Sequence, residues 1–331
     1  MNVLITGGAG FIGSHLAEAM LARGHAVTVV DDLSTGREEN LADVGHHEPM
    51  RFVRGSVRDE PLMSDLVKGA DAVFHLAAAV GVKLIAEDPV HTIETNIHGT
   101  EVVLAEAARH GRRVLIASTS EVYGKNARTP FREDDDCTLG PTRYSRWSYA
   151  CSKMVDEFLG LAYHDQFGLP TVVCRLFNTI GPRQTVQYGM VVPRFVRWAL
   201  AGEPVQVYGD GTQSRCFCHV ADVVAALAAL IDCPQAVGQV VNVGNDESVT
   251  IDALADLVLE KTGSTGGKVY VPYADAYGRP IDDLRVRKPD LTRARELIGY
   301  RPHHTLAQTL DEVIAWQRTR PAAESPPDSV S

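Results

Sequence analysis

Short apolar runs alternate with longer amphipathic segments along the first half of the chain. The runs are rich in β-branched residues and are apolar at nearly every position, which is typical of strands buried on both faces. Such runs occupy residues 2–6, 26–31, 51–55, 71–78, 112–119 and 171–178. Strands of this type, separated by amphipathic helices, predict an α/β fold: a Rossmann doubly wound parallel sheet with helices on both faces.

The pattern changes after about residue 180. Helices are predicted over 191–203, 220–233, 250–262, 290–298 and 304–318, and strands over 204–209 and 238–244. We therefore expect residues 1–180 and about 219–250 to form a dinucleotide-binding domain. Residues of about 181–218 and 251–320 would form a smaller interleaved α/β lobe that binds substrate. The polar, Pro- and Ser-rich residues 321–331 predict a disordered tail.

Charge and cysteine content narrow the class of partner. The net charge of -10, with no run of Lys or Arg, disfavours nucleic acid and anionic membranes as partners. The six cysteines are scattered without a CxxC pair or a Cys/His spacing suited to zinc, so we predict neither a metal site nor a disulfide framework. The N-terminus lacks the basic segment of a signal peptide and no apolar run reaches membrane-spanning length, so a cytoplasmic protein is expected.

Three glycines mark a candidate dinucleotide site. Gly7, Gly10 and Gly13 follow the first strand directly and stand at the start of a helix, where glycine allows close approach of backbone to a pyrophosphate. The next strand ends at Asp31, whose carboxylate can accept hydrogen bonds from a ribose diol and would repel a 2′-phosphate, so NAD is favoured over NADP. A glycine-rich turn without a nucleotide is the alternative. The other predicted cofactor contacts are Phe11, Ile12, Asp32, Ser34, Thr35, Gly36, Ser56, Val57, Leu76, Ala77, Ala78 and Ser118.

Tyr149 and Lys153 form the second candidate site. They are four residues apart, so on a helix their side chains project from one face. An ammonium beside a phenol, with the positive nicotinamide ring of NAD+ near both, stabilises the phenolate and lowers the pKa of the phenol. Tyr149 could then take the proton of a substrate hydroxyl while hydride leaves the same carbon. A surface pair without this role is the alternative.

Several motifs resemble one known family. The stretches "TGGAGFIGSH", "HLAA", "STSEVYG", "YACSK", "RLFNTIGPRQ", "VYGDGTQSRCF" and "RKPDLTRARELIGYRP" are similar to those of the extended short-chain dehydrogenase/reductase family, in particular its nucleotide-diphosphate-sugar epimerases, dehydratases and decarboxylases. The resemblance covers residues 1 to about 318. It implies NAD as cofactor, a UDP-sugar substrate and a homodimer formed through helices near 91–110 and 148–167. Ser56 departs from the pattern, because relatives usually carry an acidic residue there.

The resemblance also implies roles for single residues. Tyr149 would be the base, and Lys153 would orient both Tyr149 and the nicotinamide ribose. The rest of the implied catalytic set is Thr119, Ser120 and Glu121. The implied substrate contacts are Val80, Gly81, Asn178, Val192, Val207, Tyr208, Gln213, Arg215 and Arg287. Of these, Val207 and Tyr208 would flank the nucleobase, and the two arginines would grip the diphosphate, a task suited to the guanidinium fork.

The family reactions that the resemblance allows all begin with oxidation at C4 of the sugar. A 4,6-dehydratase is disfavoured because Ser120 stands where dehydratases carry an acidic residue, and Glu121 alone supplies one of the two acid–base groups that elimination needs. We expect a UDP-sugar 4-epimerase acting on UDP-glucuronate or UDP-glucose. Decarboxylation of UDP-glucuronate is the alternative, since those enzymes share "SEVYG" and an arginine like Arg287. A non-catalytic NAD sensor on the same fold is less expected.

Three further features have open or ordinary interpretations. Glu121 could promote chemistry beyond C4, shape the pocket or act as a helix cap. The acidic run at 132–136 is predicted to be a solvated loop. His75 is predicted to be a hydrogen-bonded core histidine rather than a catalyst.

Overall fold

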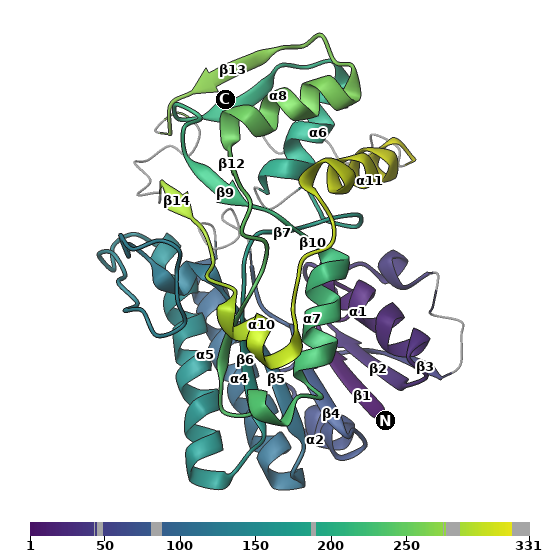
Figure 1. Ribbon diagram of the computed structural model, residues 1–331. Helices are drawn as coiled ribbons and strands as arrows, with labels where there is room; N and C mark the ends of the chain where they lie inside the picture. Colours follow the sequence, from purple (N-terminus) through teal and green to yellow (C-terminus); the bar gives the residue numbers. More distant parts are fainter. Residues whose placement is uncertain are drawn as a thin grey trace.

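The computed structural model describes residues 1–42, 44, 49–80, 88–186, 190–273, 275 and 285–319. Gly81 and the expected tail at 321–331 lie outside the described residues. Figure 1 shows a lower domain built on a broad sheet and an upper lobe of shorter elements.

A seven-stranded sheet forms the larger domain. Its order is β11-β6-β5-β4-β1-β2-β3, and all of its strand pairs are parallel. The strand order reverses between β1 and β4, so the crevice at the carboxyl ends of these two strands is the place where such folds bind ligands. The predicted Rossmann fold is confirmed. The strands are β1 (Asn2–Thr6), β2 (Ala26–Asp31), β3 (Met50–Arg54), β4 (Ala72–His75), β5 (Arg113–Thr119), β6 (Thr171–Leu176) and β11 (Val240–Val243).

Helices cover both faces of this sheet (Figure 1). Side chains alternate along β1, so that Val3 and Ile5 pack in one buried cluster with α1 and α7, whereas Leu4 packs in another with α2 and α4. Helix α5 lies against α4 on this second face. The helices are α1 (Phe11–Ala22), α2 (Glu60–Lys68), α4 (Pro89–His110), α5 (Arg146–Phe167) and α7 (Val220–Leu230), with 3-10 turns η1 (Glu38–Leu41), η2 (Ser120–Tyr123) and η3 (Pro234–Ala236).

The smaller lobe has its own core. Buried side chains of α6, α8 and α11 pack with Val205 and Val207 of β8. One small sheet has the order β12-β9-β14 and another pairs β13 with β8, while the short pair β7 and β10 joins the lobe to the larger domain. The elements are β7 (Thr179–Ile180), α6 (Val191–Ala201), β8 (Val205–Tyr208), β9 (Ser214–Cys216), β10 (Cys218–His219), β12 (Ser248–Thr250), α8 (Ile251–Thr262), β13 (Lys268–Val271), β14 (Val286–Arg287) and α11 (Leu306–Arg318).

The segment after β14 returns to the larger domain. Helix α10 (Thr292–Ile298) packs on α7 and β11 (Figure 1). Leu291, Ala294 and Tyr300 belong to the same buried cluster as α1, and the Tyr300 hydroxyl donates to the carbonyl of Gly244 at 2.8 Å. This stretch therefore packs with the larger domain, although the expected range of the lobe includes it.

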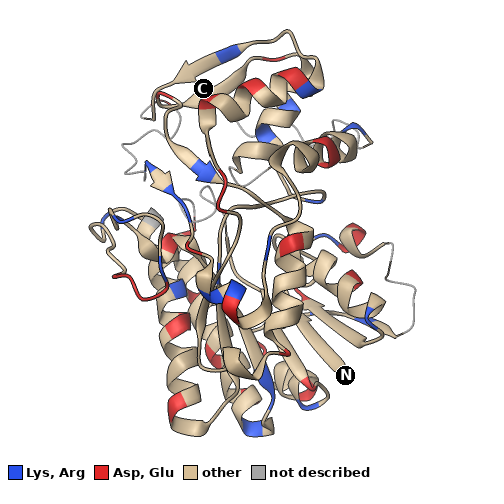
Figure 2. Cartoon of the chain, in the orientation of Figure 1, with Lys and Arg blue, Asp and Glu red and all other residues tan. Residues whose placement is uncertain are grey.

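Acidic and basic residues are spread over the outer helices, and basic positions also lie on β9 and β14 of the lobe (Figure 2). Within the described ranges, no helix is both long enough and apolar enough to span a membrane.

Candidate active site

The glycine loop joins β1 to α1. Gly7 has a left-handed φ of 69°, its amide donates to the carbonyl of Val30 at 2.9 Å, and a Cβ there would lie 2.8 Å from the backbone of Ala77. A Cβ at Gly13 would lie 2.2 Å from the carbonyl oxygen of Gly7. Side chains are therefore excluded at both positions. The loop leaves bare backbone at the N-terminus of α1, an arrangement that binds pyrophosphate.

Asp31 ends β2 and is buried beside this loop. Its Oδ2 accepts the amide of Ala9 at 2.9 Å, and its Oδ1 accepts the amide of Leu33 at 2.9 Å. A Cβ at Gly36 would lie 2.8 Å from Oδ1, so glycine is needed there. Burial raises the pKa of Asp31, and the backbone amides oppose that rise. The amides thus hold the carboxylate at the strand end where an adenosine ribose is expected.

The other predicted cofactor residues occupy loops at the carboxyl ends of neighbouring strands. Asp32 and the segment 34–36 follow β2, and the carboxylate of Asp32 accepts the amide of Ser34 at 2.9 Å. Ser56 follows β3, and its Oγ accepts the amide of Arg58 at 3.3 Å. The segment from Leu76 to Ala78 follows β4, while Phe11 and Ile12 open α1 and Val57 is buried in the core. Apart from Val57, these positions lie at the carboxyl ends of β1, β2, β3 and β4, where NAD is expected.

Tyr149 and Lys153 lie one turn apart in α5, which packs on β5 and η2. Lys153 is buried, and its Nζ donates to Oδ2 of Asp156 at 2.8 Å. Burial raises the pKa of Tyr149, and the charges of Glu121 and Asp156 raise it further, while a hydrogen bond with Thr119 lowers it. The carboxylates near Tyr149 therefore favour the neutral phenol, and an added positive charge is needed to favour the phenolate.

Glu121 forms an ion pair with a residue 166 positions away along the chain. Nη1 of Arg287 in β14 lies 2.5 Å from its Oε1, and the side chains are 7% and 26% exposed for Arg287 and Glu121. Thr119 supplies the cap of η2, since its Oγ accepts the amide of Glu121 at 3.2 Å. The Glu121 carboxylate is therefore directed to the lobe, and the ion pair brings Arg287 to residues 119–121, which were predicted to be catalytic.

Arg215 and Arg287 lie side by side. They are paired in register on the parallel strands β9 and β14, and both are buried. Neighbouring residues in register project to the same face of a sheet, so the two guanidinium groups share one face. Because Arg287 is paired with Glu121, Arg215 is the member of this pair of arginines that suits an anionic ligand such as a diphosphate.

The remaining predicted substrate residues fall into two groups. Val192 and Val207 are fully buried in the core of the lobe, where they support α6 and β8. Tyr208 lies under the guanidinium of Arg194 at 4.8 Å, and Gln213 donates to the carbonyl of Tyr208 at 2.9 Å. In the linking region, the side-chain amide of Asn178 donates to the carbonyl of Cys216 at 3.0 Å. Val80 is exposed after β4.

The model of the NAD dependent epimerase/dehydratase family matches residues 3–244, more than half of the chain. The chain belongs to this family. The predicted resemblance to nucleotide-sugar epimerases and decarboxylases is confirmed, and NAD is the cofactor, as the glycine loop and Asp31 indicate. The protein is thus an enzyme of an NAD-dependent family whose members catalyse several reactions, so its own reaction depends on individual relatives and site residues.

Two similar proteins are decarboxylases. The chain is 42% identical over 316 residues to the UDP-N-acetyl-alpha-D-glucosaminuronate decarboxylase of Bacillus cytotoxicus, with 95% of this chain and 97% of the relative covered. It is 38% identical over 317 residues to UDP-glucuronic acid decarboxylase 1 of Xenopus tropicalis, with 96% of this chain and 72% of the relative covered.

Solved structures of similar fold include epimerases. The UDP-glucose 4-epimerase of Thermotoga maritima with UDP-glucose has a TM-score of 0.87 and 31% identity, over 96% of this chain and 99% of that one. A UDP-glucuronic acid 4-epimerase mutant of Bacillus cereus, in complex with UDP-4-deoxy-4-fluoro-glucuronic acid and NAD, has a TM-score of 0.86 and 26% identity over 96% and 99% of the chains. The expected epimerase is therefore less well supported than its alternative, because the decarboxylases match at higher identity.

The sequence did not predict a buried network of charged and polar side chains behind the candidate active site. Arg175 in β6 donates from Nη2 to Oε2 of Glu157 at 2.7 Å, and Ser118 donates to the other oxygen of Glu157. Ser118, predicted to contact the cofactor, is thus hydrogen bonded to a structural pair. Helix spacing gives no signal for this network, because Glu157 in α5 and Arg175 in β6 are 18 positions apart.

The acidic run at 132–136 is also less solvated than predicted. Glu133 is buried, and its Oε1 accepts the amide of Asn242 at 2.9 Å, so this carboxylate joins the loop to β11. Asp134 instead pairs with Arg293 at 2.6 Å near the surface. His75 is buried as predicted, with Nδ1 2.8 Å from the Thr6 hydroxyl.

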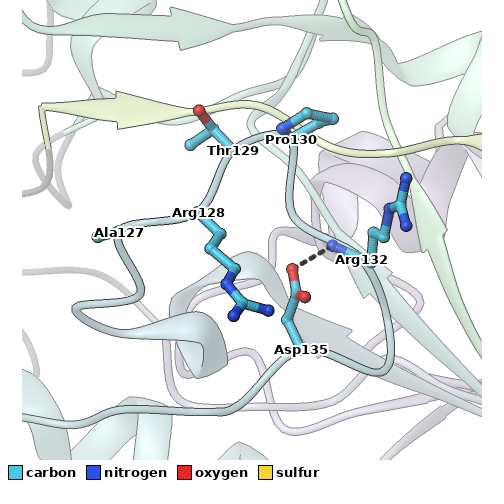
Figure 3. Close-up of a pocket in the computed structure, with 6 residues that line it drawn as sticks. All are labelled: Ala127, Arg128, Thr129, Pro130, Arg132 and Asp135. Atoms are coloured by element: carbon cyan, nitrogen blue, oxygen red, sulfur yellow. Dashed lines mark hydrogen bonds between the residues drawn. The ribbon is translucent and has the colours of Figure 1, made fainter.

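A surface pocket of about 470 Å³ lies in the loop between η2 and α5 (Figure 3). The amide of Arg132 donates to Asp135 at 2.8 Å within this loop. The pocket is lined by Ala127, Arg128, Thr129, Pro130, Arg132 and Asp135. None of the predicted site residues lines it, so it has no part in the candidate site.

Proposed function

We propose that the protein is an NAD-dependent decarboxylase of a UDP-uronic acid, either UDP-glucuronate or UDP-N-acetylglucosaminuronate. The observation that carries this proposal is the ion pair between Glu121 and Arg287, 2.5 Å apart beside Tyr149. The identity to two decarboxylases over at least 95% of the chain supports it.

Tyr149 and Lys153 perform the first step in this proposal. The phenolate of Tyr149 takes the proton of the C4 hydroxyl, while the Lys153 ammonium stabilises that phenolate. NAD, when bound, supplies the hydride acceptor for C4 and later the hydride donor. At the end of the reaction Tyr149 returns its proton to the C4 oxygen, so the residue is regenerated.

Loss of carbon dioxide follows from the oxidation at C4. The 4-keto-uronate is a β-keto acid, so the bond between C5 and the carboxyl carbon can break with its electron pair delocalised onto the C4 oxygen. A proton from solvent then replaces the carboxylate at C5. The net reaction therefore consumes one proton and releases one carbon dioxide.

The ion pair explains why the carboxylate would leave. An uncompensated buried guanidinium would stabilise the substrate carboxylate as an anion and oppose its conversion to neutral carbon dioxide. Glu121 cancels much of the charge of Arg287, so the pair can orient a carboxylate without retaining its charge. An epimerase acting on a uronate has the opposite requirement, because it must keep the carboxylate.

A 4-epimerase is the second candidate function. The structural match to the Thermotoga maritima UDP-glucose 4-epimerase, with a TM-score of 0.87, favours it. The two reactions share the oxidation at C4 and differ in whether C6 is lost or the hydride returns to the other face of C4.

Product mass distinguishes these candidates. We expect incubation of the protein and NAD+ with each UDP-uronic acid to give a product lighter than its substrate by the mass change of decarboxylation, with proton NMR showing a UDP-pentose. A product of unchanged mass with inverted C4 would support the epimerase and contradict this proposal. Tyr149→Phe serves as the control for contaminating activity, because it should give neither product.

We also propose a homodimer formed through α4 and α5. These helices pack together and carry large apolar side chains that are exposed, namely Val90 and Ile93 on α4 and Phe158 and Phe167 on α5. Two-fold pairing of this surface would remove them from water. Light scattering should show a dimer for the wild-type protein and a larger monomer fraction for Phe158→Glu. A monomeric wild-type protein would contradict the proposal.

A further inference from the structure

The candidate base is accompanied by a carboxylate that the proposed reaction does not use. Asp156 lies three residues after Lys153 in α5, with its side chain fully buried. Its Oδ2 accepts the Lys153 ammonium at 2.8 Å, while Oδ1 has no hydrogen-bond partner of ordinary geometry in the described part of the chain. Burying a carboxylate costs stability even when an ammonium pairs with it, so Asp156 is a poor choice for stability alone.

The surroundings of Asp156 contain a chain of polar groups. Burial raises its pKa, and the charge of Lys153 and the hydroxyl of Thr100 oppose that rise. The Thr100 hydroxyl lies 3.0 Å from Nε2 of His75, whose Nδ1 lies 2.8 Å from the Thr6 hydroxyl. Burial lowers the pKa of His75 to about 3, and the charge of Lys153 lowers it as well. His75 therefore stays neutral, and the carboxylate of Asp156 is the acidic group of this network that contacts the Lys153 ammonium.

Other charged groups near the candidate base have partners of their own. Two carboxylates raise the pKa of Tyr149 by their charges, Glu121 in η2 and Asp156 in α5. Glu157 acts on Asp156 but is bound by Arg175 of β6, and Glu121 is bound by Arg287 of β14. These two carboxylates are thus compensated by arginines, whereas Asp156 compensates Lys153.

We propose that Asp156 is the counter-charge of Lys153 and makes the Tyr149 base dependent on the charge of the nicotinamide ring. The proposal rests on the proposed roles of Tyr149 and Lys153, but not on which reaction follows oxidation at C4. Because Asp156 offsets part of the ammonium charge, Lys153 alone does not favour the phenolate of Tyr149. The phenolate is favoured when the positive ring adds to the ammonium, and disfavoured once the ring is neutral. Tyr149 then holds the C4 proton while the keto sugar is present, and the proton is available for the return step.

The first test measures binding and needs no catalysis. In a Tyr149→Phe background, Asp156→Asn leaves Lys153 uncompensated beside the nicotinamide, which is positive in NAD+ and neutral in NADH. We expect the ratio of the dissociation constants for NAD+ and NADH, measured by competition, to rise about tenfold. Asp165→Asn in the same background removes an exposed carboxylate from the same helix and should leave the ratio unchanged.

The second test measures the base itself. Asp156 raises the pKa of Tyr149, so its removal lowers that pKa, and the rise of the hydride-transfer rate with pH should move about one pH unit toward acid in Asp156→Asn. Stopped-flow absorbance of NADH on mixing with substrate measures that rate whichever product follows. A residue that only supports folding would lower the rate at every pH without moving the profile.

Asp156→Ala is the second variant if the Asn protein does not fold, since it removes the charge without placing an amide beside Lys153. An unchanged ratio of the NAD+ and NADH dissociation constants would overturn the proposal. So would a pH profile of the hydride-transfer rate that stays in place or moves toward alkali. The outcome is separate from that of the proposed function: a wild-type protein that inverts C4 and keeps carbon dioxide refutes the decarboxylase, while the binding ratio still decides the role of Asp156.

Discussion

The predicted cofactor side of the site, at the glycine loop and Asp31, and the proposed sugar side, at Glu121 and Arg287, are built in different ways. On the cofactor side, backbone groups of the glycine loop and the carboxylate of Asp31 are held by residues close in sequence, such as Ala9 and Leu33. On the sugar side, charged side chains from distant segments meet, as Glu121 and Arg287 do across 166 positions. The cofactor side depends on the absence of side chains at the glycines, and the sugar side depends on which charged side chains compensate one another.

This difference predicts where substitutions act on chemistry and where they act on binding. The largest effect is expected for Tyr149→Phe, which keeps the ring and removes the hydroxyl to which the proposed mechanism gives the transfer of the C4 proton. Hydride transfer should fall by about 10³-fold, within the range of general acid–base catalysis, while NAD remains bound. Stopped-flow absorbance of NADH and a binding titration measure the two effects. Tyr163→Phe, on the same helix, is the control and should retain the rate; loss of both rate and binding in Tyr149→Phe would contradict the separation of the two sides.

The buried pair of Arg175 and Glu157 tests whether compensated charges support the sugar side. Arg175→Met leaves Glu157 buried without its partner, since both side chains are 7% exposed, and should cost about 3–5 kcal/mol of unfolding free energy. Urea unfolding measures this change. Arg295→Met is the matched control, because its pair with Asp246 is exposed and should contribute less than about 1 kcal/mol. Equal losses in both variants would show that the buried network is no stronger than a surface pair.

Gly13→Ala tests the cofactor side through the space that glycine leaves. The added Cβ would lie 2.2 Å from the carbonyl oxygen of Gly7, so the loop must shift. We expect NAD to bind at least about tenfold more weakly, a loss of about 1.4 kcal/mol in binding free energy. Gly69→Ala is the control, because its added Cβ would have contacts of 3.7 Å or longer and its φ is -79°. Unchanged NAD affinity in Gly13→Ala would show that the loop can adapt.

The sequence predicts the fold and the geometry of the glycine loop because both depend on local patterns. Continuous apolar strands predict a parallel sheet, and glycines between a strand and a helix predict the loop that receives NAD. The spacing of Tyr149 and Lys153 places both on one helix face by the same local rule. The same rule makes Asp156 a neighbour of Lys153, because residues three positions apart in a helix lie on one face. The sequence alone did not single out this carboxylate as the partner of Lys153.

The sugar side was predicted less completely because its contacts join distant segments. The pairing of Glu121 with Arg287 depends on β14 lying beside β9, which no local pattern indicates. Glu133 looks like part of a solvated acidic run until the fold places the Asn242 amide against it. Val192 and Val207 were assigned to substrate by resemblance, yet both are buried in the core of the lobe. Residue type identifies a possible charge or contact, and only the fold supplies its partner.

The smallest expected effect concerns the balance between the two charges that meet on the sugar side. Glu121→Gln preserves the shape of the side chain and removes the charge that compensates Arg287. If the proposed decarboxylase is correct, the freed guanidinium should stabilise the substrate carboxylate, so release of carbon dioxide should slow about tenfold relative to hydride transfer, about 1.4 kcal/mol in barrier height. Rapid-quench product analysis beside NADH absorbance measures both steps, and a transient 4-keto-uronate should accumulate.

Because Glu121 also raises the pKa of Tyr149, the pH profile of hydride transfer should move toward acid in the same Glu121→Gln variant. Glu247→Gln, an exposed carboxylate of the loop before β12, should change neither quantity. An unchanged ratio of the two rates in Glu121→Gln would mean that Arg287 orients the carboxylate regardless of its own compensation, and that the ion pair does not separate a decarboxylase from an epimerase in this fold.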